Sequence, residues 1–136
     1  REPRGMLRAH SETPSGRLHI LNTHLDPSSD DRWRMQEVRG LLDEAGRLRA
    51  SGSRVLLGGD LNATPESAVI RALREAGWTD AWEGCGVGEG FTYPARQPLK
   101  RIDYLFLSPG LRCLRAQVVG NEVSDHRGLL VLLESV

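Results

Sequence analysis

The spacing of apolar residues along the chain predicts two helices. Between Asp31 and Gly52, apolar residues recur every three or four positions, which is typical of a helix with one face in a core. A second helix is expected to begin at Thr64 as N-cap, with Pro65 in the first turn, and to end by Gly77. Each helix is therefore expected to cover a sheet.

Short aliphatic runs predict the strands of that sheet. The segment "RLHILNTHL" alternates apolar and polar residues, and four later runs are rich in aliphatic residues: 55–57, 101–108, 114–119 and 129–133. Segments 1–15 and 78–98 are expected to form loops, with one short strand near Phe91. The order strand, helix, strand, helix and then three strands predicts an α/β fold, in which a mixed β-sheet carries helices on one face.

Composition narrows the class of protein without naming a partner. The 136 residues suit one domain, and 18 basic residues balance 18 acidic ones, so no overall charge steers the chain toward nucleic acid or an anionic membrane. No run approaches the ~18 apolar residues of a membrane span. Cys85 and Cys113 show no metal-ligand spacing, so we expect neither a disulfide framework nor a zinc site, and we favour a cytoplasmic location.

Four polar clusters stand at strand ends, where α/β sheets collect ligand-binding groups. They are "NTHLD", "GGDLN", Asp103 within "RIDYLF", and "SDH" before the last strand. Taken alone, each cluster can be explained by a structural role. Asp60 and Asn62 suit an Asx turn, and "SDHR" suits a solvated turn. Together, their carboxylates, imidazoles and amide suit a hard cation such as Mg²⁺ or Mn²⁺, and the transfer of a phosphoryl group to water.

In this order and at these separations, "NTHLD", "GGDLNATPES", "RIDYLFLS" and "SDHRGLLVLLE" resemble the endonuclease/exonuclease/phosphatase superfamily of deoxyribonuclease-like, metal-dependent phosphoesterases. The resemblance covers Leu18 to Glu134. It implies a four-layer α/β sandwich, of which residues 1–136 would form a single domain or the C-terminal half. It also implies Mg²⁺- or Mn²⁺-dependent hydrolysis of a phosphoester.

The resemblance also assigns roles position by position. His24 resembles the histidine that stabilises the phosphoryl oxygens, and Asp60 resembles the residue that orients or deprotonates the attacking water. Asn62 would fix the phosphate and the nucleophile. His126 resembles the phosphate-contacting or acid–base histidine, and Asp103 would hold its tautomer and raise its pKa.

Two further roles concern metal and substrate. Asp125 resembles a metal ligand of the last motif. In the segment "FTYPARQPLKR", the residues Tyr93, Arg96, Lys100 and Arg101 are candidates for contacting a phosphate or sugar, although a solvated loop explains them equally well. The substrate stays open among nucleic acid, a phospholipid or inositol phosphate, and a soluble phosphoester. Neutral charge argues against a nonspecific nuclease.

The sequence lacks the family's N-terminal asparagine and metal-binding glutamate, because Glu2 and Glu12 lie in no comparable strand. We therefore expect residues 1–136 alone to bind metal weakly and hydrolyse little. We also expect an exposed sheet face that invites self-association. The alternative function is a catalytically incompetent fragment or scaffold that keeps these motifs for the fold.

Overall fold

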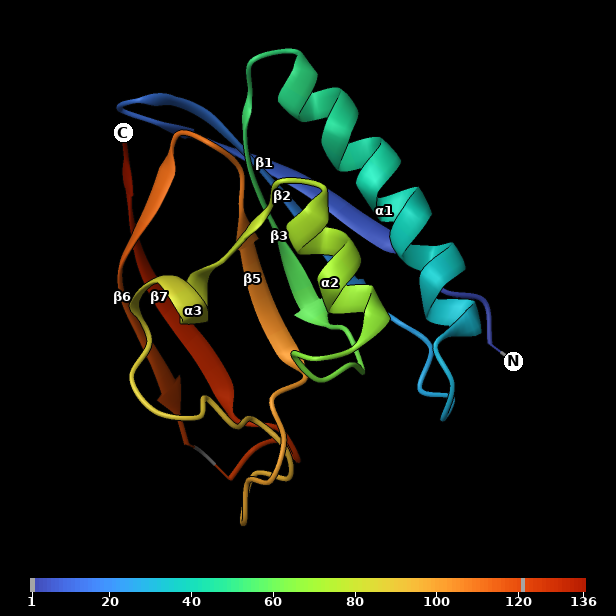
Figure 1. The fold of residues 1–136 in the computed structure, drawn as a ribbon. Helices are drawn as coiled ribbons and strands as arrows, with labels where there is room; N and C mark the ends of the chain where they lie inside the picture. The colour runs from blue at the N-terminus through green and yellow to red at the C-terminus, as the bar shows by residue number, and fades with distance from the viewer. Residues whose placement is uncertain (1, 121) are drawn as a thin grey trace.

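The computed structural model describes residues 2–120 and 122–136. In chain order its elements are β1 (Met6–Thr13), β2 (Gly16–His24), α1 (Arg32–Ala50), β3 (Arg54–Asp60), α2 (Ala68–Glu75), β4 (Thr79–Asp80), α3 (Ala81–Cys85), β5 (Asp103–Leu107), β6 (Leu111–Val119) and β7 (Gly128–Ser135). One sheet has the order β1-β2-β3-β5-β4, in which β2 and β3 run parallel and the other pairs antiparallel. β6 and β7 form a separate two-stranded sheet (Figure 1). The predicted α/β fold with a mixed sheet is confirmed.

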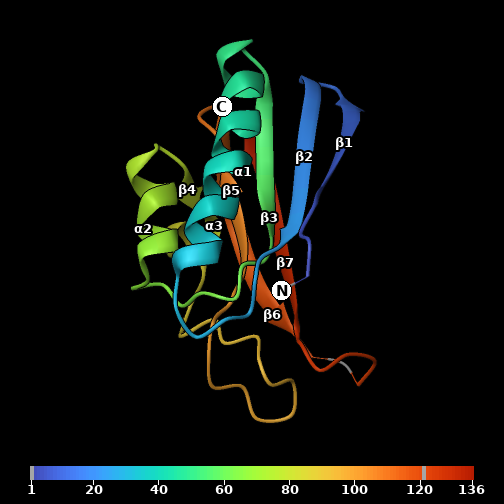
Figure 2. The same ribbon diagram turned by 90° about the vertical axis from the view of Figure 1, so that its right-hand side faces the viewer.

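Helices α1 and α2 cover one face of the five-stranded sheet, as predicted (Figure 2). Alternate residues of the central strands point into this core, among them Val55 and Leu57 of β3 and Tyr104 and Phe106 of β5. All four are fully or almost fully buried. Because successive residues of a strand point to opposite faces of the sheet, the residues that alternate with these four in β3 and β5 point to the other face.

The opposite face is less completely covered. The β6–β7 sheet lies on this side (Figure 1), and Leu18 and Arg54 of the large sheet and Leu133 of β7 line a hollow. The outer surface of the small sheet leaves Leu130 and Leu132 more than half exposed. Self-association through an exposed sheet face stays a prediction.

Strand β1 occupies a segment for which the sequence predicted a loop. It pairs antiparallel with β2 over its full length, from Met6 opposite Thr23 to Thr13 opposite Gly16. Gly16 takes a φ of 110°, which allows the tight turn between the strands. Because the side chains of β1 are mostly exposed, no hydrophobic alternation marked it as a strand.

The second helix begins later than predicted, and a third helix was missed. Ser67 is the N-cap of α2, and its hydroxyl accepts a hydrogen bond from the N–H of Ile70. Thr64 instead donates its hydroxyl to Glu66. The region predicted as loop contains β4 and α3, which are too short to show a period, whereas the predicted strand near Phe91 is reduced to one bridge between Tyr93 and Lys100.

Cys85 and Cys113 form a disulfide, so the expectation of an unpaired, unstapled chain was wrong. Their Cα atoms lie 5.8 Å apart although 28 positions separate them in sequence. The bond joins the end of α3 to β6. Such pairing depends on tertiary contact, which the spacing of two cysteines does not reveal. None of the described helices combines the length and apolar character needed to cross a membrane.

Candidate active site

Three neighbouring strands bring His24, Asp60 and Asp103 into line at one end of the large sheet. His24 of β2 lies opposite Asp60 of β3, and Asp60 lies opposite Asp103 of β5. Residues paired in this way point to the same face, here the face opposite the helices. The His24 Nε2 atom lies 3.3 Å from the Asp60 Oδ2 atom.

The glycine pair before Asp60 lets the strands approach closely at this point. A Cβ atom on Gly58 would lie 2.0 Å from the carbonyl oxygen of Tyr104, and one on Gly59 would lie 2.0 Å from that of Thr23. Gly59 also has a φ of 126°. Any other residue would therefore push β3 away from its neighbours, so "GGD" is a steric requirement for the position of Asp60.

Asn62 fixes the turn that follows Asp60. Its backbone N–H donates to Asp60 Oδ1 at 3.0 Å, and its side-chain amide donates to the carbonyl of Leu25 at 2.8 Å. The φ of Asn62 is 47°, a left-handed conformation that asparagine tolerates better than most residues. The turn thus holds the Asp60 carboxylate by a local contact and ties β3 to the end of β2.

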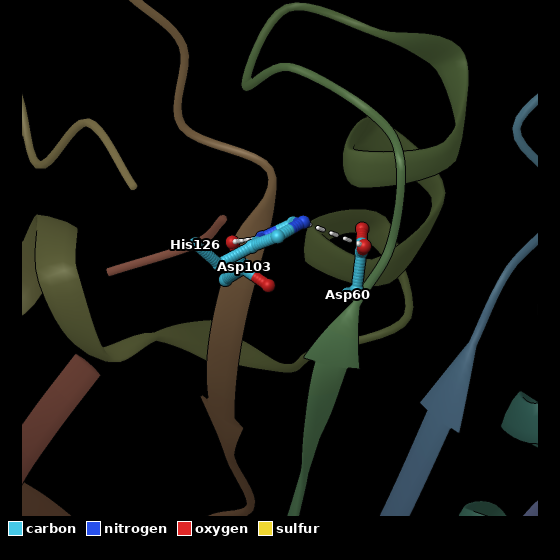
Figure 3. A group of neighbouring side chains, drawn as sticks. All are labelled: Asp60, Asp103 and His126. Atoms are coloured by element: carbon cyan, nitrogen blue, oxygen red, sulfur yellow. Dashed lines mark hydrogen bonds and ion pairs between the residues drawn. The ribbon is translucent and has the colours of Figure 1, made fainter. Parts of the chain in front are cut away.

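His126 reaches this line of residues from the loop before β7. Its Nδ1 atom lies 2.8 Å from Asp103 Oδ2, and its Nε2 atom lies 3.5 Å from Asp60 Oδ2. Figure 3 shows the imidazole lying between the two carboxylates. The structure therefore brings His126, Asp103 and Asp60 into one cluster, and their catalytic roles stay predictions.

Thr92 and the residues after it support this cluster. Thr92 is completely buried, and its hydroxyl donates to Asp103 Oδ2 at 2.6 Å. The carbonyl of Thr92 accepts from the N–H of Arg127 at 2.7 Å, and the N–H of Ala95 donates to the carbonyl of Asp125 at 2.7 Å. Arg127 Nε donates back to Ala95. Arg127, for which the sequence indicated no role, thus helps to hold the loop that carries His126.

The surroundings raise the pKa values of two groups in the cluster, Asp60 and His126. Burial, aided by the charge of Asp103, raises the pKa of Asp60 above its ordinary value, and the Asn62 N–H and the nearby histidines offset this only in part. Burial lowers the pKa of His126, but its hydrogen bond to Asp103 and the neighbouring carboxylates outweigh that effect, so its pKa is raised overall. The carboxylate becomes a better proton acceptor, and the imidazole keeps its proton to higher pH.

A cleft of about 690 Å³ opens over these residues. Its lining includes six of the seven residues predicted for the site: His24, Asp60, Asn62, Asp103, Asp125 and His126. Tyr93 and Lys100 also line it, whereas Arg96 lines a different hollow. Arg4 was not predicted, because an isolated polar residue carries no signal of where its side chain points, and Asn22 of "NTHLD" lines the cleft without an assigned role.

Arg101 does not line the cleft, contrary to its predicted role in substrate binding. Its guanidinium is buried and lies 2.8 Å from Asp80 Oδ2, with the Asp80 carboxylate equally buried. A side chain held in this way has no access to a substrate. Arg101 therefore supports the fold rather than the chemistry.

The site offers suitable donors for a cation. Ligand atoms of Asp60, Asp103 and His126 lie within 4.8 Å of one another. Four carboxylates line the cleft, and the raised pKa of Asp60 is due first to burial and then to the neighbouring charge of Asp103. The carboxylates of this donor set fit a hard divalent cation. Asp125, the predicted metal ligand, is exposed and lines the same cleft, but stands outside this group of three.

Comparisons with known proteins agree with this geometry. The model of the endonuclease/exonuclease/phosphatase family matches residues 3–126. A mannosyl-6-phosphatase from Bacteroides thetaiotaomicron shares 22% identity and a TM-score of 0.85, over 97% of this chain and 57% of that one. The catalytic domain of human Nocturnin with bound sulfate shares 20% identity and a TM-score of 0.80, over 98% and 53%.

TDP2 from C. elegans shares 24% identity and a TM-score of 0.73, over 93% of this chain and 45% of that one. At these identities the likeness shows a common fold, and the chain spans about half the length of these structures. A search among curated proteins finds no match to the sequence.

Proposed function

The chain belongs to the endonuclease/exonuclease/phosphatase family, and from this premise we propose that it hydrolyses a phosphoester with a water molecule activated in the cleft. The observation that carries the proposal is the alignment of His24, Asp60 and Asp103 on adjacent strands, with His126 between the two carboxylates. Residues far apart in sequence would thus act together: Asp60 as proton acceptor, His126 as proton donor and Asp103 as the partner of His126.

We assign the proton acceptor to Asp60. Its carboxylate faces the cleft, and its raised pKa makes it more basic than an exposed aspartate. It would orient the attacking water and take its proton. Asn62 would hold the phosphate and the water beside it, and His24 would donate a hydrogen bond to a phosphoryl oxygen, where negative charge accumulates.

We assign the proton donor to His126. Asp103 accepts from Nδ1, which leaves Nε2 to face the cleft and the Asp60 carboxylate. The raised pKa keeps this imidazole protonated to higher pH than an ordinary histidine, which suits it to donate to the departing or phosphoryl oxygen. Thr92 keeps Asp103 in place while the proton moves.

We propose Mg²⁺ or Mn²⁺ as the cofactor. The carboxylates of Asp60 and Asp103 would hold it, with Asp125 as a further ligand, while His126 keeps its proton for donation. When bound, such an ion supplies a Lewis acid that neutralises charge on the phosphoryl oxygens. Oxygen donors favour these ions over softer ones, whereas the lone imidazole does not by itself select zinc.

The test is hydrolysis of bis(p-nitrophenyl) phosphate and p-nitrophenyl phosphate in Mg²⁺, Mn²⁺ or EDTA. From residues 1–136 alone we expect slow, metal-dependent release of nitrophenol, which Asp60→Asn and His126→Asn should each reduce by at least about 100-fold. Asp43→Asn on the exposed side of α1 and His10→Asn on β1 are matched controls and should retain the rate. Activity that survives both site substitutions would reject the assignment.

The substrate class needs a separate panel. Plasmid DNA, an oligonucleotide with an abasic site, a phospholipid such as sphingomyelin, inositol phosphates and a hexose 6-phosphate represent the candidates. The balanced charge of the chain argues against nonspecific nuclease action, so we expect the small phosphoesters to be preferred. The second candidate function is a chain that keeps the fold without turnover; the chain covers 45–57% of the three structures named above. Binding of metal without hydrolysis of any substrate would support it.

A further inference from the structure

Arg4 lies in the wall of the cleft with hydrogen-bonding capacity that the described part of the protein does not use. Its side chain is only 15% exposed, and its Nε atom is buried without a hydrogen-bond partner. Its terminal nitrogen lies 3.6 Å from Glu2, whose side chain is 82% exposed. An ion pair of this length with a solvated carboxylate contributes little.

Two other buried arginines show what a structural arginine looks like in this chain. Arg34 donates from all three of its guanidinium nitrogens to one carboxylate and two backbone carbonyls, and Arg101 donates to both oxygens of Asp80. Buried polar groups normally find such partners because leaving them unpaired is costly. Arg4 Nε departs from this rule, as do His19 Nδ1 and Arg74 Nε, but of these three residues Arg4 alone lines the cleft.

The backbone fixes Arg4 beside His24. The carbonyl of Gly5 accepts from the Thr23 hydroxyl at 2.9 Å, and Met6 pairs with Thr23, the residue before His24. These contacts anchor the entry to β1 at the end of β2. The backbone next to Arg4 is therefore held at the end of β2, and the side chains of Arg4 and His24 line the same cleft.

The cleft is lined by more carboxylates than permanently cationic side chains, so a cationic residue is needed to bind an anionic phosphate. Its lining includes four carboxylates, from Glu2, Asp60, Asp103 and Asp125, but only two permanently cationic side chains, Arg4 and Lys100. Lys100 is exposed and lies over the ring of Tyr93, 5.6 Å from its centre. Arg4 is the less exposed of the two, and its planar guanidinium can donate two parallel hydrogen bonds to two phosphoryl oxygens.

We propose that Arg4 is a phosphate-binding residue, which grips the phosphoryl oxygens of the substrate on the His24 side of the cleft. This inference rests on the proposed function for the identity of the ligand. It adds a binding contact from the entry to β1, a segment in which the sequence indicated no site.

The experiment is a titration of the 136-residue protein with inorganic phosphate, in EDTA and in MgCl₂, followed by ¹⁵N NMR of the arginine Nε–H signals. We expect the Arg4 signal to shift on binding. Arg4→Gln should weaken phosphate binding roughly 10- to 100-fold, the effect of losing charge-assisted hydrogen bonds. Arg17→Gln is the matched control: Arg17 is exposed, pairs with Glu12 and lies at the start of β2, so its loss should leave the affinity unchanged.

Two results would overturn the inference: no binding of phosphate by the wild-type protein in either buffer, or equal binding by Arg4→Gln. Should Arg4→Gln fail to fold by circular dichroism, Arg4→Lys keeps the charge without the fork and should still bind more weakly than wild type. Equal binding by Arg4→Lys would then reject the role of the guanidinium. Phosphate binding that depends on Arg4 without any hydrolysis would reject only the proposed function, and hydrolysis with unaltered phosphate binding in Arg4→Gln would reject only this inference.

Discussion

Two charged clusters lie at the same end of β5, and they differ in how their charges are satisfied. Arg101 and Asp80 form a closed pair in which both side chains are almost completely buried. Asp103, two residues further along, forms an open cluster with His126 and Asp60, each with about a fifth of its side chain exposed to the cleft. The first cluster has used its bonding capacity within the protein, whereas the second keeps some of it for solvent or a ligand.

The difference separates structural from functional charge more reliably than residue type does. Asp80 also caps α3, accepting from the N–H of Trp82 at 3.0 Å, so its pair with Arg101 holds a helix in place. Asp60 instead carries a raised pKa, because burial and a second carboxylate destabilise its charged form. Unrelieved charge next to a cleft is a property of sites that bind or react.

The largest expected effect breaks the closed pair. Arg101→Ala leaves the Asp80 carboxylate buried without its partner, and we expect the free energy of unfolding to fall by about 3–5 kcal/mol. Urea denaturation measures this, with Arg17→Ala as the exposed control, for which we expect a change below about 0.5 kcal/mol. A loss of less than about 1 kcal/mol for Arg101→Ala would mean that Asp80 is not dependent on this pair.

The next largest effect concerns the C-terminal end of α3, the helix that Asp80 caps at its other end. The disulfide between Cys85 and Cys113 ties the end of α3 to β6, and it closes a loop defined by a separation of 28 residues. Replacing both cysteines by alanine should lower the free energy of unfolding by about 3 kcal/mol, chiefly by relaxing the unfolded chain. Urea denaturation and alkylation followed by mass spectrometry check both the stability and the bond. Free thiols in protein purified without reductant would contradict this prediction.

The elements of the fold differ in how well the sequence alone predicts them. Periodicity located α1, β2, β3 and β5, because these elements have a buried face that dictates apolar residues. It missed β1, whose residues are mostly exposed, and α3, which is shorter than two helical turns. These elements owe their structure to pairing with β2 and to the Asp80 and Cys85 contacts, which are tertiary.

For the candidate site, the ordered motifs at strand ends predicted six residues that line one cleft. They did not distinguish Arg101 from Asp103, although only two positions separate these residues. The direction of each side chain depends on where β5 begins and on the presence of Asp80, neither of which the local sequence states. Thr92 and Arg4 were missed for the same reason, since burial and unused donors appear only in three dimensions.

A smaller effect tests the support of the open cluster. Thr92→Val removes the hydroxyl that donates to Asp103 while keeping the shape of the side chain, and we expect a loss of about 1–3 kcal/mol in the free energy of unfolding. Thr92→Ser should recover most of it, because it keeps the donor. Thr79→Val, at the exposed position of β4, is the matched control and should be nearly neutral. Equal stability of the valine and serine variants would show that the hydroxyl does not hold Asp103.

The smallest expected effect concerns how the open cluster responds to pH. The pKa of His126 is raised above its ordinary value of 6.5, so its contribution to stability is complete below pH 6.5 and is lost as pH rises through the higher folded value. Asp103→Asn removes the charge that outweighs burial, and we therefore expect NMR titration in EDTA to show a lower pKa for His126. Stability should then fall less between pH 6.5 and the wild-type pKa of His126. Asp43→Asn is the control, because its carboxylate is exposed on α1. An unaltered His126 titration in Asp103→Asn would mean that the cluster is as closed as the Asp80 pair, with other groups compensating, and the distinction between the two clusters would fail.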